Sequence, residues 1–295
     1  MQWKRDFGLT WRIWMTLLLL LLVYLVFLGV LSALGVGWEF LILLAGGMAF
    51  FQYFFSDRLV LWSTGARVVE ADEYPELHRM VERLSAEAGI PKPRVAVVPS
   101  PVPNAFATGR NPKNAVVAAT DSLMRILNKD ELEAVLAHEL SHVRYRDVFT
   151  LTVASFISMV AFILVRNWFF MGMFGGGGRR DGGNPWIIVF LVSIVVWVAS
   201  TLLIRALSRY REYAADRGSA ELTRNPGALA SALQKISGRM ESVAPQKKRE
   251  VEGANAFFII PALSGNTLME LFSTHPPLEK RLAALEDLER ELKGY

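Results

Sequence analysis

The chain has 295 residues, 52% of them hydrophobic, and a mean hydropathy of +0.29. It is therefore too apolar for an ordinary soluble enzyme, and its length allows one large domain or two small ones. The absence of cysteine excludes a disulfide framework, a thiolate metal site and a thiol nucleophile. The net charge of +4 is small and comes from mixed acidic and basic residues, which argues against nucleic-acid binding.

The first apolar run, residues 14–34, carries no charge. At about 1.5 Å per residue it can cross a hydrocarbon core of about 30 Å. Basic residues precede it, as in a cleaved signal peptide, but it is longer than the usual apolar region of about 7–15 residues. A second apolar stretch, residues 38–55, follows almost at once. Residues 1–56 are therefore expected to form a pair of transmembrane helices.

Residues 57–147 are rich in charges and prolines and are expected to be the first half of a folded aqueous domain. Within them, residues 74–88 carry apolar side chains at helical spacing. Residues 94–98 and 114–119 are short β-rich runs bounded by turn residues. Residues 104–108 are expected to form a third, edge-like strand.

Two further charge-free runs lie within residues 148–205, at 148–165 and 186–204. Buried helices of a large soluble core are the alternative, but neither run has the polar stripe of a surface helix. Both are therefore expected to enter the membrane as a hairpin. The glycine-rich connection between them, residues 175–183, is expected to be a flexible loop.

Residues 206–295 are expected to be the second half of the aqueous domain, closed by an amphipathic helix at residues 277–292. With four spans, both termini and both halves of the domain lie on one side of the bilayer. Lys and Arg residues flank the spans more often on that side than on the other. This asymmetry predicts that the aqueous domain is cytoplasmic.

A well-started amphipathic helix carries the sequence His-Glu-Leu-Ser-His. Asn128 is an N-cap candidate with Glu131 three positions later, the pattern of a capping box. His138 and His142 are four residues apart, so their imidazoles lie one turn above each other and can converge on one ion. Glu139 sits beside the pair. Two exposed histidines on a solvated helix are the less favoured alternative, because the chain has only four histidines.

This pattern indicates metal-dependent hydrolysis. A zinc ion with three protein ligands keeps a water molecule in the remaining position and lowers its pKa towards neutrality. Glu139 would take the proton of that water and pass it to the leaving amine. Because thiolates are absent, histidine and carboxylate side chains must hold the metal, and one zinc ion per chain is expected.

The third ligand is expected to be a carboxylate, because no further histidine follows soon enough to complete a longer histidine motif. Residues 208–216 continue the fourth apolar run as a helix, with Glu212 and Asp216 on one face. Glu212 can complete the site, and Asp216 can accept a hydrogen bond from the free N–H of a ligand histidine. A surface helix of paired Glu and Arg side chains is the alternative. Because His142 lies a few residues before the third apolar run and Glu212 a few residues after the fourth, the metal ligands are expected near the membrane surface.

The two remaining histidines carry less information. His78 lies in a charged amphipathic helix and is expected to be a solvated surface residue. His275 precedes two prolines that stiffen the chain. Its ring could be aimed at the metal site, or it could cap the helix that follows.

Four segments together resemble the HtpX family of membrane zinc metalloproteases, and the resemblance spans most of the chain. They are residues 104–109 (Asn-Ala-Phe-Ala-Thr-Gly), 138–142 (His-Glu-Leu-Ser-His), 212–216 (Glu-Tyr-Ala-Ala-Asp) and 274–277 (Thr-His-Pro-Pro). The resemblance implies zinc ligands, a general base and a supporting carboxylate. These are His138, His142 and Glu212 for the metal, Glu139 for the base, and Asp216 for the support.

The same resemblance implies that His275 helps to stabilise the oxyanion. It also implies that Asn104, Ala105, Phe106 and Ala107 form an edge strand to which the substrate backbone pairs. Members of the family act in the cytoplasmic (inner) membrane on damaged or misfolded membrane proteins. The expected partners are therefore membrane-protein or unfolded polypeptide substrates and the lipid bilayer.

Two other functions are alternatives. A CAAX-type prenyl protease shares the zinc chemistry but usually has more spans, and a membrane scaffold or chaperone-like binder would not need Glu139. The fold class expected is an α+β membrane protein. About four transmembrane helices join a helix-rich, zincin-type cytoplasmic domain with a small β-sheet.

Overall fold

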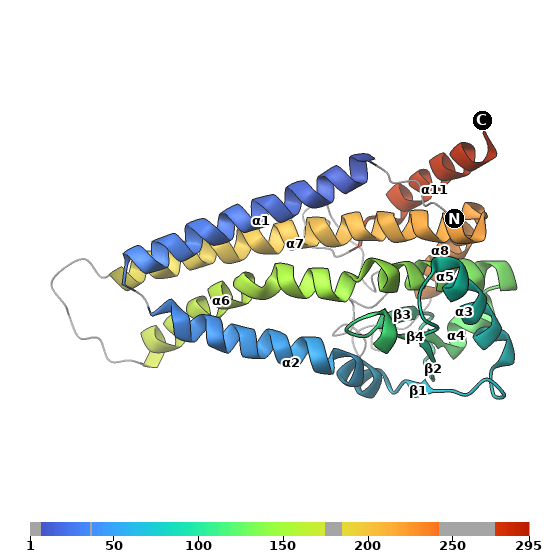
Figure 1. The fold of residues 1–295 in the computed structure, drawn as a ribbon, viewed down its shortest axis with the longest axis horizontal. Coiled ribbons are helices and arrows are strands. Elements are labelled where there is room, and N and C mark those ends of the chain that lie inside the picture. Colours follow the sequence, from blue (N-terminus) through green and yellow to red (C-terminus); the bar gives the residue numbers. More distant parts are fainter. Residues whose placement is uncertain (1–6, 36, 175–184, 242–274, 295) are drawn as a thin grey trace.

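A computed structural model describes residues 7–35, 37–174, 185–241 and 275–294. Four long helices lie lengthwise, and a small sheet with shorter helices gathers at one end (Figure 1). This is the α+β membrane architecture predicted from the sequence. The predicted glycine-rich connection, residues 175–183, lies outside the described residues.

Within the described residues, three helices are long and apolar enough to cross a bilayer, and a fourth qualifies if its two parts count as one span. The three are α1 (Phe7–Ala33), α6 (Asp147–Phe174) and α7 (Pro185–Thr223). The fourth, α2 (Trp38–Thr64), bends by 61° between Phe55 and Asp57. The chain is therefore a membrane protein.

The membrane helices pack in a defined order. Helix α7 lies between α1 and α6, and α6 packs in turn against α2 (Figure 1). The Tyr24 hydroxyl donates to the carbonyl of Ala154 at 2.5 Å, and the Ser200 hydroxyl donates to Ser158 at 2.8 Å. Such interhelical hydrogen bonds fix the helices relative to one another where lipid supplies no hydrophobic drive for association.

The sheet has four strands in the order β1-β2-β4-β3. They are β1 (Arg67–Val68), β2 (Arg94–Val98), β3 (Ala105–Thr108) and β4 (Val116–Thr120). Strands β2 and β4 are parallel, whereas β1 and β3 pair antiparallel at the two edges. Three strands lie where the sequence predicts them, and β3 is an edge strand as expected. Strand β1 was not predicted, because two residues are too few to show an alternating pattern.

Helices cover both faces of the sheet. On one face, α3 (Pro75–Ala88) and α5 (Lys129–Tyr145) bury valines of β2 and β4. On the other face, Val60 in the last turns of α2 packs against Phe106 of β3. Helix α2 thus continues beyond residue 56, where the N-terminal pair of helices was expected to end, and packs against the sheet at that end of the molecule.

Helix α5 lies at the centre of that end. The Asn128 side chain accepts a hydrogen bond from the Glu131 backbone N–H, and the Glu131 carboxylate accepts one from the Asn128 N–H, both at 2.9 Å. This is the capping box predicted from the sequence. Three further helices complete the layer around α5: α4 (Asp121–Ile126), α8 (Pro226–Glu241) and α11 (Leu278–Lys293).

Candidate metal centre

Two helices that are far apart in the sequence meet at the end of the molecule that carries the sheet. Helix α5 carries His138 and His142, and α7 carries Glu212 in the part that continues beyond the fourth apolar run, as predicted. The two helices are in direct contact. The Ser219 hydroxyl of α7 donates to the carbonyl of Ala134 in α5 at 2.6 Å. This contact fixes the ligand-bearing faces against each other.

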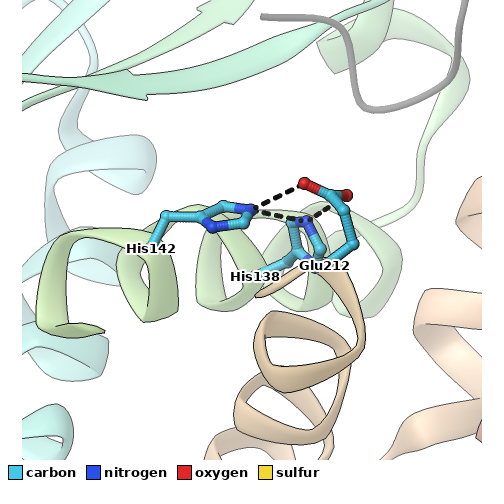
Figure 2. A group of neighbouring side chains, drawn as sticks. All are labelled: His138, His142 and Glu212. Carbon is cyan, nitrogen blue, oxygen red and sulfur yellow. Dashed lines mark hydrogen bonds and ion pairs between the residues drawn. The ribbon is translucent and has the colours of Figure 1, made fainter. Parts of the chain in front are cut away.

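The three predicted metal ligands point at one another. Figure 2 shows the rings of His138 and His142 facing the carboxylate of Glu212. The two Nε2 atoms are 3.2 Å apart, Glu212 Oε1 lies 3.4 Å from His142 Nε2, and Glu212 Oε2 lies 3.7 Å from His138 Nε2. His138 and Glu212 are 1% and 5% exposed. The structure therefore brings together the three side chains that the sequence singled out.

The donor set fits a metal ion. Each Nδ1 faces a carboxylate, as described below, so Nδ1 would keep its proton when a metal binds and both Nε2 atoms would then be acceptors. Three acceptor atoms within 4.8 Å of one another repel unless positive charge lies among them. Ligand atoms about 2.0–2.1 Å from one tetrahedral zinc ion lie about 3.3–3.4 Å apart, close to the separations found.

His138 is supported by a buried carboxylate and a buried guanidinium. Asp216 Oδ1 lies 2.9 Å from His138 Nδ1, the ring nitrogen that was expected to donate to Asp216. Arg281, in the first turn of α11, donates to both oxygens of Asp216, at 2.9 Å from Nε and 2.6 Å from Nη2. Asp216 and Arg281 are each 1% exposed. A carboxylate this deeply buried requires such a partner.

His142 has a similar support that the sequence did not predict. Asp147, the first residue of α6, lies with Oδ2 2.6 Å from His142 Nδ1. Arg211 of α7 binds the other oxygen of Asp147 and donates to the carbonyl of Tyr145 at 2.7 Å. The support could have been inferred from the position of Asp147, which follows directly after the end of the helix that carries His142. The charged pair ties the base of the membrane hairpin to a metal ligand.

Burial and charge set the protonation of α5. Burial alone would lower the pKa of His138, but hydrogen bonds to Asp216 and Glu212 outweigh it and raise the pKa to about 9, so a proton or a metal ion on Nε2 is favoured at neutral pH. Burial raises the pKa of Glu139 above its ordinary value, towards the pKa that suits a general base near neutral pH. Burial lowers the pKa of His142. The site thus attracts positive charge and holds a carboxyl group of raised basicity beside it.

The two remaining histidines have different places. His275 is 7% exposed, and its Nδ1 lies 2.9 Å from Glu212 Oε2, so its ring faces the metal site. This is the first of the two orientations that the sequence allowed. His78 is not the solvated residue predicted, since it is half-buried and its Nε2 lies 3.0 Å from the carbonyl oxygen of Val69. It joins α3 to the end of β1.

The edge strand lies beside the metal-binding helix. Ala107 and Thr108 of β3 line one pocket together with His142 and Val143 of α5. In the described part of the chain, β3 pairs with β4 on one side and with no strand on the other.

Both ends of this strand are fixed. Asn104 is buried; its N–H donates to Thr120 Oγ1, and its carbonyl accepts from the Thr120 N–H, both at 2.9 Å. The strand stops at Gly109, which has φ +125°, and a Cβ there would lie 2.5 Å from the carbonyl oxygen of Asn114. Only glycine fits this turn. The strand therefore has a fixed position relative to the ligands.

Comparison with known proteins assigns the chain to a family. Residues 71–289 match the model of peptidase family M48. The chain belongs to peptidase family M48. Members of this family of metalloproteases hold a metal ion, which agrees with the convergence of His138, His142 and Glu212.

Two relatives of this M48 chain are similar over almost their whole lengths. The Protease HtpX homolog of Moorella thermoacetica is 58% identical over 98% of this chain and 97% of its own. Protease HtpX homolog 2 of Methanosarcina acetivorans is 57% identical over 99% of both. The crystal structure of Ste24p from S. mikatae is 20% identical, covers 93% of this chain and 67% of that chain, and has a TM-score of 0.58, which indicates the same fold. The chain is therefore an HtpX-like membrane metalloprotease, as the sequence predicted.

Proposed function

We propose that the chain is a zinc-dependent endopeptidase that cleaves misfolded or damaged membrane proteins. The observation that carries this proposal is the convergence of three acceptor atoms from His138, His142 and Glu212 within 4.8 Å. Three histidine and carboxylate ligands with one open position are typical of catalytic zinc. One zinc ion per chain is expected at this place.

The roles of the surrounding side chains follow from their positions. Bound zinc supplies a Lewis acid that activates water and polarises the peptide carbonyl. Glu139 accepts the proton of the attacking water and passes it to the leaving amine. His275, beside Glu212, donates to the oxyanion that forms on the carbonyl. Asp216 keeps the His138 ring in the tautomer that leaves Nε2 free for the metal.

The substrate backbone pairs with the open side of β3. Asn104, Ala105, Phe106 and Ala107 form or precede this strand, and its end borders the same pocket as His142. Strand addition gives affinity through main-chain hydrogen bonds and is tolerant of sequence. Tolerance of this kind suits an enzyme that removes damaged proteins.

The proposed arrangement divides the chain into four segments. Residues 1–56 and 148–205 supply the two pairs of membrane helices, and residues 57–147 and 206–295 supply the two halves of the catalytic domain. The excess of Lys and Arg beside the spans on the domain side supports a cytoplasmic domain in the cytoplasmic (inner) membrane.

The two alternative functions are not favoured. Relatives of 57–58% identity are named Protease HtpX homologs, and a prenyl protease would be expected to have more spans. A scaffold or chaperone-like binder has no use for a buried carboxyl group beside two metal-binding histidines. Glu139 is buried, at 5% exposed, next to both of them.

The decisive experiment is cleavage of an unfolded membrane protein by the full-length chain in detergent. Zinc-loaded protein should cleave the substrate, a zinc chelator should abolish cleavage, and added zinc should restore it. The Glu139→Gln variant should retain zinc and lose activity by about 10²–10⁴-fold, the usual contribution of a general base. Metal content and cleavage are measured on the same samples.

Glu133→Gln is the matched control, because it makes the same chemical change on α5 at a half-buried residue that pairs with the exposed Arg83. It should keep nearly full activity. Equal activity of the Glu139→Gln variant and the wild type would remove Glu139 from the mechanism. A folded, zinc-loaded wild type that cleaves no unfolded membrane protein would show that the substrate class is wrong.

A further inference from the structure

An apolar stripe runs along the outer side of α2 and continues past its bend. It consists of Phe51, Phe55, Leu59 and Trp62, which are 53%, 38%, 46% and 83% exposed. Phe51 and Phe55 are four residues apart before the bend, and Leu59 and Trp62 are three residues apart after it, so each pair shares one side of its part of the helix. Exposed aromatic side chains that lie together in this way mark a contact surface. We call this surface the α2 stripe.

The opposite side of the same turns is buried against the sheet. Val60 is 6% exposed and packs with Phe106 of β3. Asp57 is 8% exposed, and its Oδ2 lies 3.5 Å from Arg94 Nη2, at the start of β2. The last turns of α2, Asp57–Thr64, are therefore amphipathic: one side binds the catalytic domain and the other faces outward.

Arginines lie close to the stripe. The guanidinium of Arg58 is 6.0 Å from the centre of the Phe55 ring, and that of Arg110 is 5.3 Å from the centre of the Phe54 ring. Aromatic rings with neighbouring basic side chains are typical of the membrane–water interface, where basic groups reach the lipid phosphates.

We propose that residues 57–64 lie in the headgroup region of the bilayer leaflet next to the catalytic domain, with Leu59 and Trp62 in contact with lipid. Lipid is favoured over a protein partner because Leu59 and Trp62 follow directly after Phe51 and Phe55, which lie on the apolar part of the same helix. The 61° bend turns these last turns away from the direction of the span. An amphipathic helix with aromatic and basic residues binds the interface in this way.

One consequence concerns the edge strand and rests on the proposed function. Phe106 of β3 and Val60 of α2 belong to one apolar cluster, and a helix with its side chains is about 10–12 Å thick. Strand β3 is therefore held about one helix diameter from the lipid. A substrate segment that leaves the bilayer reaches the strand without crossing a wide layer of water.

Nitroxide labels test the lipid contact without any measurement of activity. The chain contains no cysteine, so a label on Leu59→Cys or Trp62→Cys reports from that position alone. The full-length variants are reconstituted in liposomes with anionic lipid, and collisions with oxygen and with a water-soluble nickel complex are measured. A label on Leu25→Cys, on the exposed side of α1, is the lipid reference. A label on Glu87→Cys, on the exposed side of α3, is the water reference.

The labels at positions 59 and 62 should collide with oxygen more often than with nickel, between the two references but nearer to Leu25. Collisions like those at Glu87 would place the segment in water and overturn the proposal. Protection from both reagents would mean that protein covers the stripe. Dipolar broadening that grows with protein density would then identify a second copy of the chain.

Activity supplies an independent check. The double variant Leu59→Glu, Trp62→Glu should cleave a membrane-embedded substrate roughly tenfold more slowly, because the effective concentration of substrate at β3 falls. Cleavage of a soluble unfolded peptide should not change, which separates this effect from a failure of the catalytic site. Leu292→Glu on α11, at a position that is 38% exposed, is the control and should affect neither substrate. Equal loss on both substrates, or no loss on either, would contradict the proposal.

Discussion

The two histidines proposed to bind the metal, His138 and His142, are supported by the same kinds of side chain, drawn from different regions of the molecule. Behind His138, Asp216 and Arg281 form a pair that is 1% exposed at each residue and lies within the catalytic domain. Arg281 belongs to the last helix of the chain. This support depends on the docking of α11 against α7.

Behind His142, the support lies at the base of the membrane hairpin. Asp147 begins α6, Arg211 belongs to α7, and the His142 side chain is 19% exposed. The two halves of the site thus respond to different parts of the fold. A change in how α6 and α7 pack acts on His142, whereas loss of the C-terminal helix acts on His138.

The largest effect is expected from Arg281→Met. This change leaves the Asp216 carboxylate buried without its partner, which should destabilise the protein by about 3–5 kcal/mol and release the metal. Thermal unfolding in detergent and metal content are the measurements. Adding Asp216→Asn should restore part of the stability, because an amide needs no counter-charge. A single variant as stable as the wild type would show that the pair does not hold the domain together.

Asp216→Asn and Asp147→Asn compare the two supports directly. Each amide can keep the histidine in place but no longer raises the basicity of its ring, and losses of metal affinity of about 10–100-fold are usual for such changes. We expect the larger loss for Asp216→Asn, because water can reach His142 more easily than His138. Competition with a zinc chelator measures both affinities. Equal losses, or the reverse order, would mean that burial does not distinguish the two supports.

The smallest effect is expected from Glu131→Gln, which alters α5 at the end away from His142. The Glu131 carboxylate closes the capping box and accepts from Lys235 at 2.8 Å. A glutamine can still close the capping box, but it loses the charge pair with Lys235. The change should therefore cost at most about 1 kcal/mol of stability and leave the metal affinity unchanged. Any loss of affinity like that of Asp147→Asn would show that the general stability of α5, and not the local support, controls metal binding.

The cost of Glu131→Gln should also depend on pH. Burial raises the pKa of Glu131, but contacts with Lys235, Ser231 and the Asn128 N–H lower it below its ordinary value. A carboxyl with a lowered pKa contributes stability above its unfolded pKa of about 4.3 and loses that contribution as the pH falls through the folded value. Unfolding curves of variant and wild type should therefore converge in acid and differ at neutral pH.

The sequence predicted those parts of the site that depend on local spacing. His138, His142 and the capping box follow from a helix period, and Glu212 follows from the continuation of an apolar run into a charged one. The strand β2 begins and ends where the sequence placed it, at Arg94 and Val98. Each of these features depends only on residues that are close together in the sequence.

The supporting arginines were not predicted, because their roles depend on tertiary contacts. Arg211 and Arg281 are two of many arginines in amphipathic stretches, and nothing local marks the carboxylates they bind. The orientation of His275 was undecided for the same reason. The amphipathic end of α2 was missed because its apolar residues merge with those of the preceding span.

The order of synthesis follows from where the site residues lie in the chain. His138 and His142 are made early, but Glu212 follows 70 residues after His142, and Arg281 another 69 residues later. At about 5–20 residues per second, a growing chain therefore spends roughly 7–28 s with both histidines and without the complete site. We therefore expect a partly synthesised chain to be inactive towards its own nascent neighbours until the C-terminal helix has docked.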